Sequence, residues 1–347
     1  MFYKNTFLLI LFTFLIFPTV IIYISVGPVH IPFSEVMKIL YIGIMKSIGF
    51  KNAHSTNSNF FEYYDIVWRI RLPRVLAGLI AGACLSVAGL LLQVLFRNPI
   101  VGPWVLGVES GSMLAVGLLV LAGALAIPGG VTSPWAIFTA SLAGSLCVMF
   151  LVLSIASIVR SVVTLLLIGI MIGYICSAVL SILEVLARSI QLHAFIIWSF
   201  GSLSFITWTQ LKVMTYIALP CVISSMLLGK YLNAYLLGEE YAKTLGVDIR
   251  KVRIVIILLA SILTSIITAF AGPIAFIGLA VPHIARLILR TSDARYLIPA
   301  SALLGALLTV YCDLAARTVL SPQELPISTM TSLIGAPIVI SLLMKRR

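Results

Sequence analysis

Residues 75–95 read VLAGLIAGACLSVAGLLLQVL, an apolar run without a charged side chain. A helix of about 20 apolar residues is long enough to cross the hydrocarbon core of a bilayer. Gly78, Gly82 and Ser86 recur at every fourth position, so they share one face of that helix, and small residues at this spacing let helices approach closely in lipid. The run predicts a membrane-spanning helix whose small-residue face packs against a neighbour or, alternatively, lines a translocation path.

Similar runs recur along the whole chain. Of its 347 residues, 61% are hydrophobic and only 10% are charged, whereas soluble domains are about a quarter charged. We expect spans at residues 7–26, 75–95, 105–127, 134–158, 162–186, 211–228, 254–270, 274–289, 296–320 and 327–344. The span at 274–289 is short enough to cross only in part, and the span at 7–26 is too long for a signal peptide and lacks a cleavage site. The pattern predicts one domain, residues 1–347, that is an all-α polytopic membrane protein with about ten transmembrane helices.

The net charge of +12 comes from Lys and Arg residues in the short connections between the expected spans. An even number of spans puts both termini on one side. If that side is the cytoplasm, most connections follow the rule that inner loops are rich in Lys and Arg. The scatter of these residues argues against a nucleic-acid surface.

The connection at residues 27–74 breaks this rule, because it is an outer loop that carries six basic residues, among them Arg71 and Arg74. Val36, Ile39, Leu40 and Ile44 recur at helical spacing within it. They predict an amphipathic helix at the membrane interface, followed by a polar turn at residues 52–59. A solvated loop is the alternative.

The motifs of several enzyme classes are missing from the sequence. No GxxxxGK[ST] is present to hold nucleotide phosphates, and no HExxH or GxSxG is present. The four histidines are dispersed, and the five cysteines lie in apolar stretches without metal-ligand spacing. We expect no catalytic residue and no metal ligand in this chain, so any ATP must be used by a partner.

Acidic residues within the expected spans are few, and they bear on an alternative function. Glu184 and Arg188, and likewise Asp313 and Arg317, are spaced i, i+4, which favours local neutralisation over a proton relay. An ion-coupled secondary transporter is therefore the second hypothesis, and a receptor-like membrane protein is the third. Dependence of transport on ATP and a separate ATPase distinguishes the first from the second.

Short motifs from about residue 65 to the C-terminus resemble, in the same order, those of the FecCD family of permeases. They are Arg71, Leu72, Pro73, Arg74, Gly78, Gly82, Gly89, Gln93, Arg97, Asn98, Pro99, Leu106 and Gly107; Gly238, Glu239, Ala242, Leu245, Gly246 and Val247; Gly272, Pro273, Ile274, Gly278, Leu279, Val281, Pro282, His283 and Arg286; and Asp313, Arg317, Glu324, Leu325, Pro326, Ile334, Gly335, Ala336 and Pro337. The resemblance covers most of the chain.

The resemblance implies a type II ABC importer permease fold in a bacterial-type cytoplasmic (inner) membrane, with both termini in the cytoplasm. It implies three kinds of protein partner: a second permease subunit in a homo- or heterodimer, two ATP-binding subunits, and an extracytoplasmic substrate-binding protein. ATP and Mg²⁺ would be bound by the partner ATPase, with no cofactor in this chain. The implied cargo is a metal chelate, most readily a ferric siderophore, with haem, cobalamin and molybdate as alternatives.

Arg71, Arg74 and Arg317 match the arginines that the family presents at the outer mouth to glutamates of the binding protein. On this hypothesis they form exposed charge pairs that steer docking, which also accounts for the basic outer loop. The alternatives are that Arg71 and Arg74 snorkel beside the second span and that Arg317 pairs with Asp313.

Two further sets of residues match functional segments of the family. Residues 229–253 correspond to the cytoplasmic coupling segment that docks on the ATPase, and the matching residues are Gly238, Glu239, Ala242, Leu245, Gly246 and Val247. The gate at the cytoplasmic constriction corresponds to Asn98, Pro99 and Ile100, with Val162 and Val163 where some relatives have Ser or Thr. The valines predict a more hydrophobic seal. An ordinary cytoplasmic loop is the alternative for the coupling segment.

Overall fold

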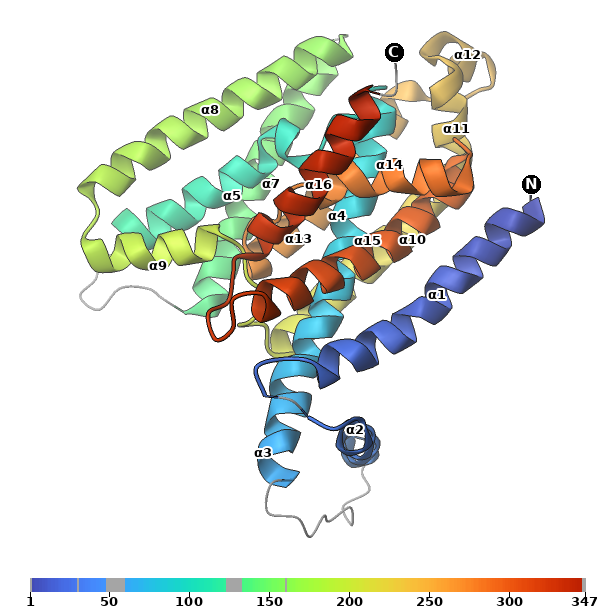
Figure 1. Ribbon diagram of the computed structural model, residues 1–347. Coiled ribbons are helices and arrows are strands. Elements are labelled where there is room, and N and C mark those ends of the chain that lie inside the picture. The colour runs from blue at the N-terminus through green and yellow to red at the C-terminus, as the bar shows by residue number, and fades with distance from the viewer. Residues whose placement is uncertain (1, 30, 48–59, 123–132, 160, 345–347) are drawn as a thin grey trace.

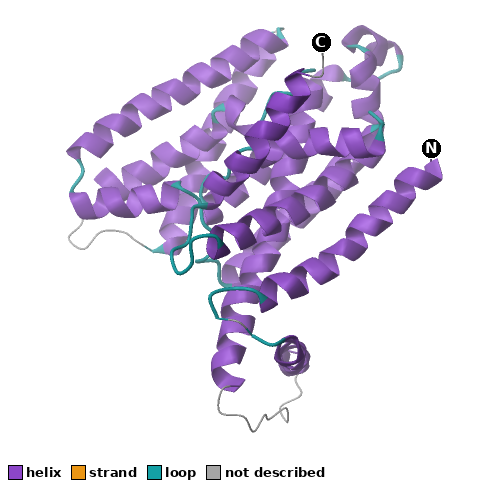
Figure 2. Cartoon of the chain, viewed as in Figure 1, coloured by secondary structure: helices purple, strands orange, loops and turns teal. Residues whose placement is uncertain are grey.

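The computed structural model describes residues 2–29, 31–47, 60–122, 133–159 and 161–344, and every regular element within these ranges is a helix (Figures 1 and 2). The helices are α1 (Phe2–Ser25), α2 (Phe33–Ser47), α3 (Phe60–Tyr64), η1 (Asp65–Arg71), α4 (Leu72–Leu95), η2 (Pro103–Leu106), α5 (Val108–Gly117), η3 (Leu118–Ala122), α7 (Pro134–Ile158), α8 (Val162–Leu186), α9 (Ser189–Ser199), α10 (Trp208–Leu227), α11 (Gly229–Leu237), α12 (Glu239–Thr244), α13 (Ile249–Ala271), α14 (Ile277–Leu289), α15 (Ala294–Thr318) and α16 (Ile327–Met344). η1 and η3 are π-helical and η2 is a 3-10 helix.

The predicted fold class is confirmed. Among the described residues, 7 helices are long and apolar enough to cross a membrane. Three shorter apolar helices, Val108–Ala122, Ile277–Leu289 and Ile327–Ser341, coincide with the remaining expected spans. Each predicted span therefore falls on an apolar helix, including the short one at 274–289.

The start of the second span differs from the prediction. We expected a loop up to residue 74, but helical structure is continuous from Phe61 to Leu95. The extension is held by Trp68, which packs on Gly43 of α2 and accepts a hydrogen bond at its carbonyl from Trp208 Nε1 at 2.8 Å. The predicted amphipathic helix is present as α2, whereas the predicted turn at 52–59 lies outside the described residues.

Helix α4 is the centre of the bundle, and it contacts α10, α13, α14 and α15. In the most apolar part of the helix that contains α4, 78% of the residues are buried, whereas in the corresponding parts of α1 and α8 at the periphery 22% are buried. A Cβ atom on Gly82 would collide with the backbone of Gly305 in α15, and one on Gly89 would collide with Gly278 in α14. The predicted small-residue face therefore packs closely against neighbouring helices, as expected in lipid.

The bundle has two distinct ends (Figure 1). The short helix α12 and both labelled chain ends lie toward one of them, and α2 and α3 project from the other. We refer to these as the α12 end and the α2 end. Both termini thus lie toward the same end, as an even number of crossings requires.

Candidate functional site

The last turn of α1 is held at the α2 end by two arginines from other helices. Arg71 donates to the carbonyl oxygens of Ile24 and Val29, and Arg317 of α15 donates to those of Tyr23 and Val26. The last carbonyls of a helix have no intrahelical partner, and cations are favourable there because of the helix dipole. Arg71 and Arg317 therefore fix the end of α1 against α4 and α15.

The third arginine, Arg74 of α4, forms a buried ion pair. Its Nε and Nη2 donate to the two carboxylate oxygens of Asp313 at 2.8 and 2.9 Å. Nη1 donates to both oxygens of Glu324 at 2.9 and 3.0 Å. The buried hydroxyl of Tyr23 also donates to Asp313, and Ser204 Oγ donates to Glu324 at 2.7 Å. We call Tyr23, Arg71, Arg74, Asp313, Arg317 and Glu324 the outer cluster.

The expectation that the three arginines form exposed charge pairs is wrong for the chain as described. Arg71, Arg74 and Arg317 are 4%, 5% and 3% exposed. Helix α1 packs against α15 and covers them, and a buried cation is stable only when it has hydrogen-bond partners. The same burial contradicts the alternative that Arg71 and Arg74 snorkel beside the span.

The alternative for Arg317 is wrong as well. Asp313 pairs with Arg74, whereas the guanidinium of Arg317 lies over the ring of Tyr23, 3.9 Å from its centroid. The sequence spacing favoured Arg317 as the partner of Asp313, because the two residues lie one helical turn apart. Tyr23 and Glu324 were missed as members of this cluster, since only the tertiary packing brings α1 and the 319–326 connection to α15.

Glu324 is the half-exposed member of the outer cluster. Its side chain is 41% exposed, whereas those of Arg74 and Asp313 are 6% and 2% exposed. Partial burial favours the neutral acid, but hydrogen bonds from Arg74 and Ser204 prevail and hold the pKa of Glu324 below its ordinary value. Glu324 is thus a carboxylate at neutral pH, and it is the more exposed of the two carboxylates that bind Arg74.

The predicted coupling segment forms α11, α12 and the start of α13 at the α12 end. Gly238 (φ +130°) separates α11 from α12, and Gly246 (φ +80°) follows α12. Val247 N–H donates to the carbonyl of Ala242 at 3.0 Å, and Gly246 N–H donates to that of Lys243 at 2.9 Å. This is the Schellman arrangement, which favours glycine at the left-handed position. Two glycines therefore delimit α12 as a separate short helix.

One face of α12 is fixed and the other is open. Ala242 is fully buried, and Glu239 accepts hydrogen bonds from Tyr235 Oη at 2.6 Å and Arg253 Nη2 at 3.3 Å. Tyr241 and Leu245 are 53% and 57% exposed. Exposed apolar side chains on a short, well-anchored helix are typical of a surface that a partner covers.

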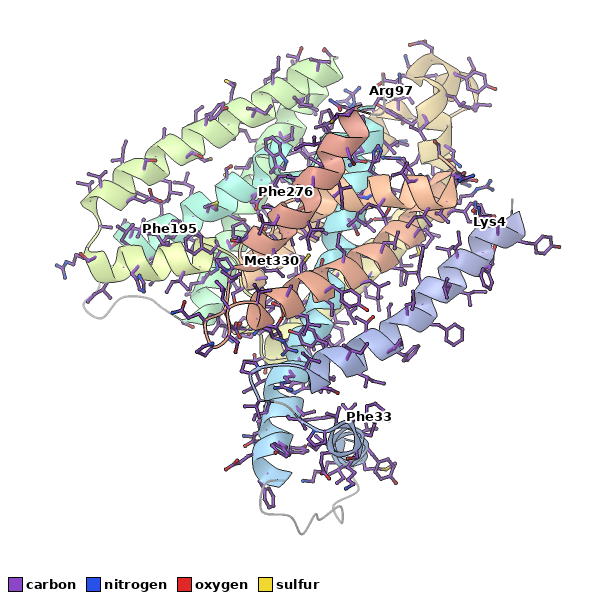
Figure 3. The ribbon with its side chains drawn as sticks, viewed as in Figure 1. Lys4, Phe33, Arg97, Phe195, Phe276 and Met330 are labelled. Atoms are coloured by element: carbon purple, nitrogen blue, oxygen red, sulfur yellow. The ribbon has the colours of Figure 1, made fainter. Side chains whose placement is uncertain are left out.

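The predicted gate residues also lie at the α12 end. Asn98, Pro99 and Ile100 follow α4, and Val162 and Val163 begin α8, whose first turn Ser161 caps by accepting from Thr164 N–H at 3.2 Å. Figure 3 shows Arg97, which immediately precedes the gate residues, at this end of the bundle. Ile100 and Val163 are exposed by 42% and 67%.

Within the described ranges, no group of three or more His, Cys, Asp or Glu side chains is placed to hold a metal ion. His283 lies in the last turns of α14, and the neighbouring Arg286 donates from Nη1 to Gln93 Oε1 at 2.7 Å. This bond ties α14 to α4.

Comparison with known proteins finds relatives that match most of the length of this chain. Residues 11–345 match the FecCD transport family. The hemin transport system permease protein HmuU of Yersinia pestis is 35% identical over 309 residues, which cover 87% of this chain and 89% of HmuU. The vitamin B12 import system permease protein BtuC of Vibrio cholerae is 39% identical over 282 residues, which cover 81% of this chain and 83% of BtuC.

A solved structure has the same fold. It is described as an inward-facing conformation of an ABC transporter assigned to the metal-chelate type, and it superposes with a TM-score of 0.82 at 29% identity over 97% of this chain and 99% of its own. The apolar bundle and these likenesses define a multi-pass membrane permease of the ABC transporter class. The chain belongs to the FecCD transport family, so the resemblance found in the sequence motifs is confirmed.

Proposed function

We propose that this chain is the permease subunit of an ABC importer that moves a metal chelate through the membrane, driven by ATP that a separate subunit hydrolyses. The observation that carries the proposal is the likeness, over more than four fifths of the chain, to permeases named for hemin and vitamin B12. Both molecules enclose a metal in an organic ligand. A ferric siderophore remains the leading cargo, and haem, cobalamin and molybdate are the alternatives.

The α12 end faces the cytoplasm in this proposal, with both termini on that side. Its support is the charge distribution. Arg97 and Arg290 lie in connections at that end, Lys230 lies in α11 and Arg250 in the first turn of α13, and Lys and Arg favour the inner side. Tyr241 and Leu245 of α12 would enter a groove of the ATPase. Movement of the ATPase pair would then displace α12 and the bundle as a rigid body.

The α2 end receives the substrate-binding protein. The outer cluster contains three arginines and two carboxylates, which leaves one net positive charge and favours an acidic partner surface. The buried arginines would act mainly by holding the end of α1 and the 319–326 connection in place. A partner carboxylate that displaces Glu324 would pair directly with Arg74 Nη1.

The gate lies in the residues that follow α4. Asn98, Pro99 and Ile100 would form the cytoplasmic constriction together with Val162 and Val163 across the dimer of permease subunits. Ile100 and Val163 are exposed in the single chain. Apolar side chains at such a point would make a seal that excludes water.

Reconstitution tests the proposal. The chain is co-purified in lipid with candidate ATPase and binding-protein subunits, and uptake of ferric siderophores, hemin, cobalamin and molybdate into vesicles is measured with and without ATP. A stable complex that takes up one of these only with ATP supports the proposal and names the cargo. Uptake by this chain alone, driven by an ion gradient, would instead establish the secondary transporter.

A further inference from the structure

Tyr235 in α11 contacts separate segments through its hydroxyl, its backbone carbonyl and its ring. Its side chain is fully buried. Its hydroxyl donates to Glu239 of α12 at 2.6 Å, its carbonyl accepts from Arg97 Nη2 at 3.0 Å, and the guanidinium of Arg97 lies 5.2 Å from its ring centroid. One residue therefore contacts both the segment after α4 and the predicted coupling helix.

Arg97 has an unusual backbone for its residue type. It follows the end of α4 with φ +47°, and Asn98 N–H donates to the carbonyl of Gln93 at 3.1 Å across it. This is the helix-ending position that glycine normally occupies. A side chain adds backbone strain there, so an arginine at this position points to a use for its guanidinium. The contact with Tyr235 is that use.

Glu239, the contact partner of Tyr235 on α12, is also held in place. Glu239 begins α12 and also accepts from Arg253 of α13. Burial and the bond to Glu239 raise the pKa of Tyr235 to about 12, so its hydroxyl remains a donor at neutral pH. Gly238, which lies between Tyr235 and Glu239, has φ +130° and no atom near the place of a Cβ. Glycine adopts this conformation without steric cost, and the side-chain contacts add to the buried Ala242 in fixing where α12 lies.

The surroundings leave room for this unit to move. A cavity of about 250 Å³ lies beside it and is lined by Arg97, Pro99, Leu236 and Arg286, among others. Pro99 is one of the predicted gate residues. The gate segment therefore has space into which it can shift when Arg97 moves.

We propose that Arg97, Tyr235 and Glu239 form a relay that makes the position of the gate segment, residues 98–100, depend on the position of α12. The inference rests on the proposed function, since it assigns the route by which the ATPase-docking helix acts on the gate. Tyr235 and Arg97 are positioning residues, because they act through α12 and through the gate segment. A purely structural role for the same contacts would stabilise α11 without linking the two segments.

Hydrogen exchange of the intact chain in lipid nanodiscs tests the relay without any need for transport. Tyr235→Phe removes only the bond to Glu239, and Arg97→Gly removes the contacts with Tyr235 while it relieves the left-handed backbone. Both variants should speed exchange of the amides at 242–247 at least threefold, although the side-chain contacts described for Arg97 are with Tyr235 of α11. Tyr216→Phe, an exposed tyrosine of α10, is the matched control and should change nothing.

The double variant decides between a relay and two independent effects. If the contacts act in series, the amides at 242–247 should exchange no faster in the double variant Arg97→Gly, Tyr235→Phe than in the more affected single variant. In the reconstituted complex, both single variants should also lower the amount of chelate moved per ATP hydrolysed, by about fivefold, with ATPase binding retained. Unchanged exchange at 242–247 in Arg97→Gly, or additive effects in the double variant, would overturn the relay.

Failure of the relay and failure of the proposed function are distinguishable. A wild-type complex without ATP-dependent uptake contradicts the proposed function and leaves the exchange result standing. A wild-type complex that transports, together with variants whose coupling ratio and exchange match the wild type, contradicts the relay alone.

Discussion

Arg74 and Asp313 form a two-pronged ion pair between α4 and α15, although they lie 239 positions apart in the sequence. Both side chains are almost fully buried. The pair joins the central helix of the bundle to the helix that it contacts most extensively, and Tyr23 adds α1 to the same point. The outer cluster thus fixes three helices at the end where we propose that the binding protein docks.

Asp313→Asn should destabilise the protein strongly, because it leaves the guanidinium of Arg74 buried without its counter-ion. Breaking a buried pair typically costs about 3–5 kcal/mol. Thermal unfolding in detergent should show a clear loss of stability. Asp65→Asn is the matched control, since Asp65 pairs with Arg69 on the surface with side chains 56% and 71% exposed, and such pairs contribute about 1 kcal/mol or less. Equal effects of the two variants would contradict a structural role for the buried pair.

Gly82→Ala should disrupt the packing of α4 on α15. The added methyl group meets the backbone of Gly305, which cannot turn away as a side chain can. Overpacking of this kind costs about 1–3 kcal/mol. Gly78→Ala on the same face meets only the side chains of Val310 and Leu203, at 3.3 and 3.4 Å, and should be tolerated. The yield of folded protein and its unfolding temperature compare the two, and a reversed order would be inconsistent with the described helix contact.

Leu245→Asp should prevent binding of the ATPase and leave the fold intact. Leu245 is 57% exposed on α12, so the carboxylate remains in water in the free chain, where surface changes alter stability by about 0.5 kcal/mol at most. In a complex it would be buried in an apolar contact. Co-purification with the ATPase measures the effect, and Leu320→Asp at the opposite end, with Leu320 54% exposed, is the control. Retained binding in Leu245→Asp would place the ATPase contact elsewhere.

Glu324→Gln should tighten docking of an acidic binding protein by a few-fold. The change removes one negative charge from the outer cluster and weakens the hold on Arg74 Nη1. Binding should fall as salt is raised for both wild type and variant, because exposed charges are screened. Affinity measured at low and high ionic strength, with Glu35→Gln on α2 as control, tests this. Weaker docking of Glu324→Gln at low salt would show that Glu324 itself is part of the recognised surface.

Asp293 should make stability depend on pH in the acid range. Hydrogen bonds from Arg295, and then from Asn233 of α11, lower its pKa to about 2. Since the folded pKa lies below the unfolded value of about 3.9, its contribution is present above pH 4 and is lost as the pH falls toward 2. Unfolding of wild type and Asp293→Asn should therefore differ at pH 6 and converge near pH 2. A constant difference over this range would contradict the assignment.

The sequence alone determined the apolar spans and the class of protein. Apolar runs such as 75–95 are long enough to span a bilayer, and in lipid each span must satisfy its own backbone hydrogen bonds, so composition and length were sufficient to predict all ten apolar helices. The short span at 274–289 was predicted for the same reason, whereas the amphipathic helix was predicted from the helical spacing of Val36, Ile39, Leu40 and Ile44. The ordered motifs then indicated the FecCD family, which the full-length relatives confirmed.

Only the tertiary structure decided the partners of the charged side chains. Asp313 and Arg317 are one helical turn apart, yet Asp313 pairs with Arg74, because the face of α15 that carries it is pressed against α4. The burial of Arg71, Arg74 and Arg317 depends on the packing of α1 against the bundle. The apolar sequence of α1 does not indicate where it packs. In the same way Tyr235 shows no motif, and only the meeting of α4, α11 and α12 gives it three contacts. Helix formation depends on local composition, so it can be predicted from the sequence. Ion pairs and relays depend on which helix faces contact each other, and packing of the whole bundle determines those contacts.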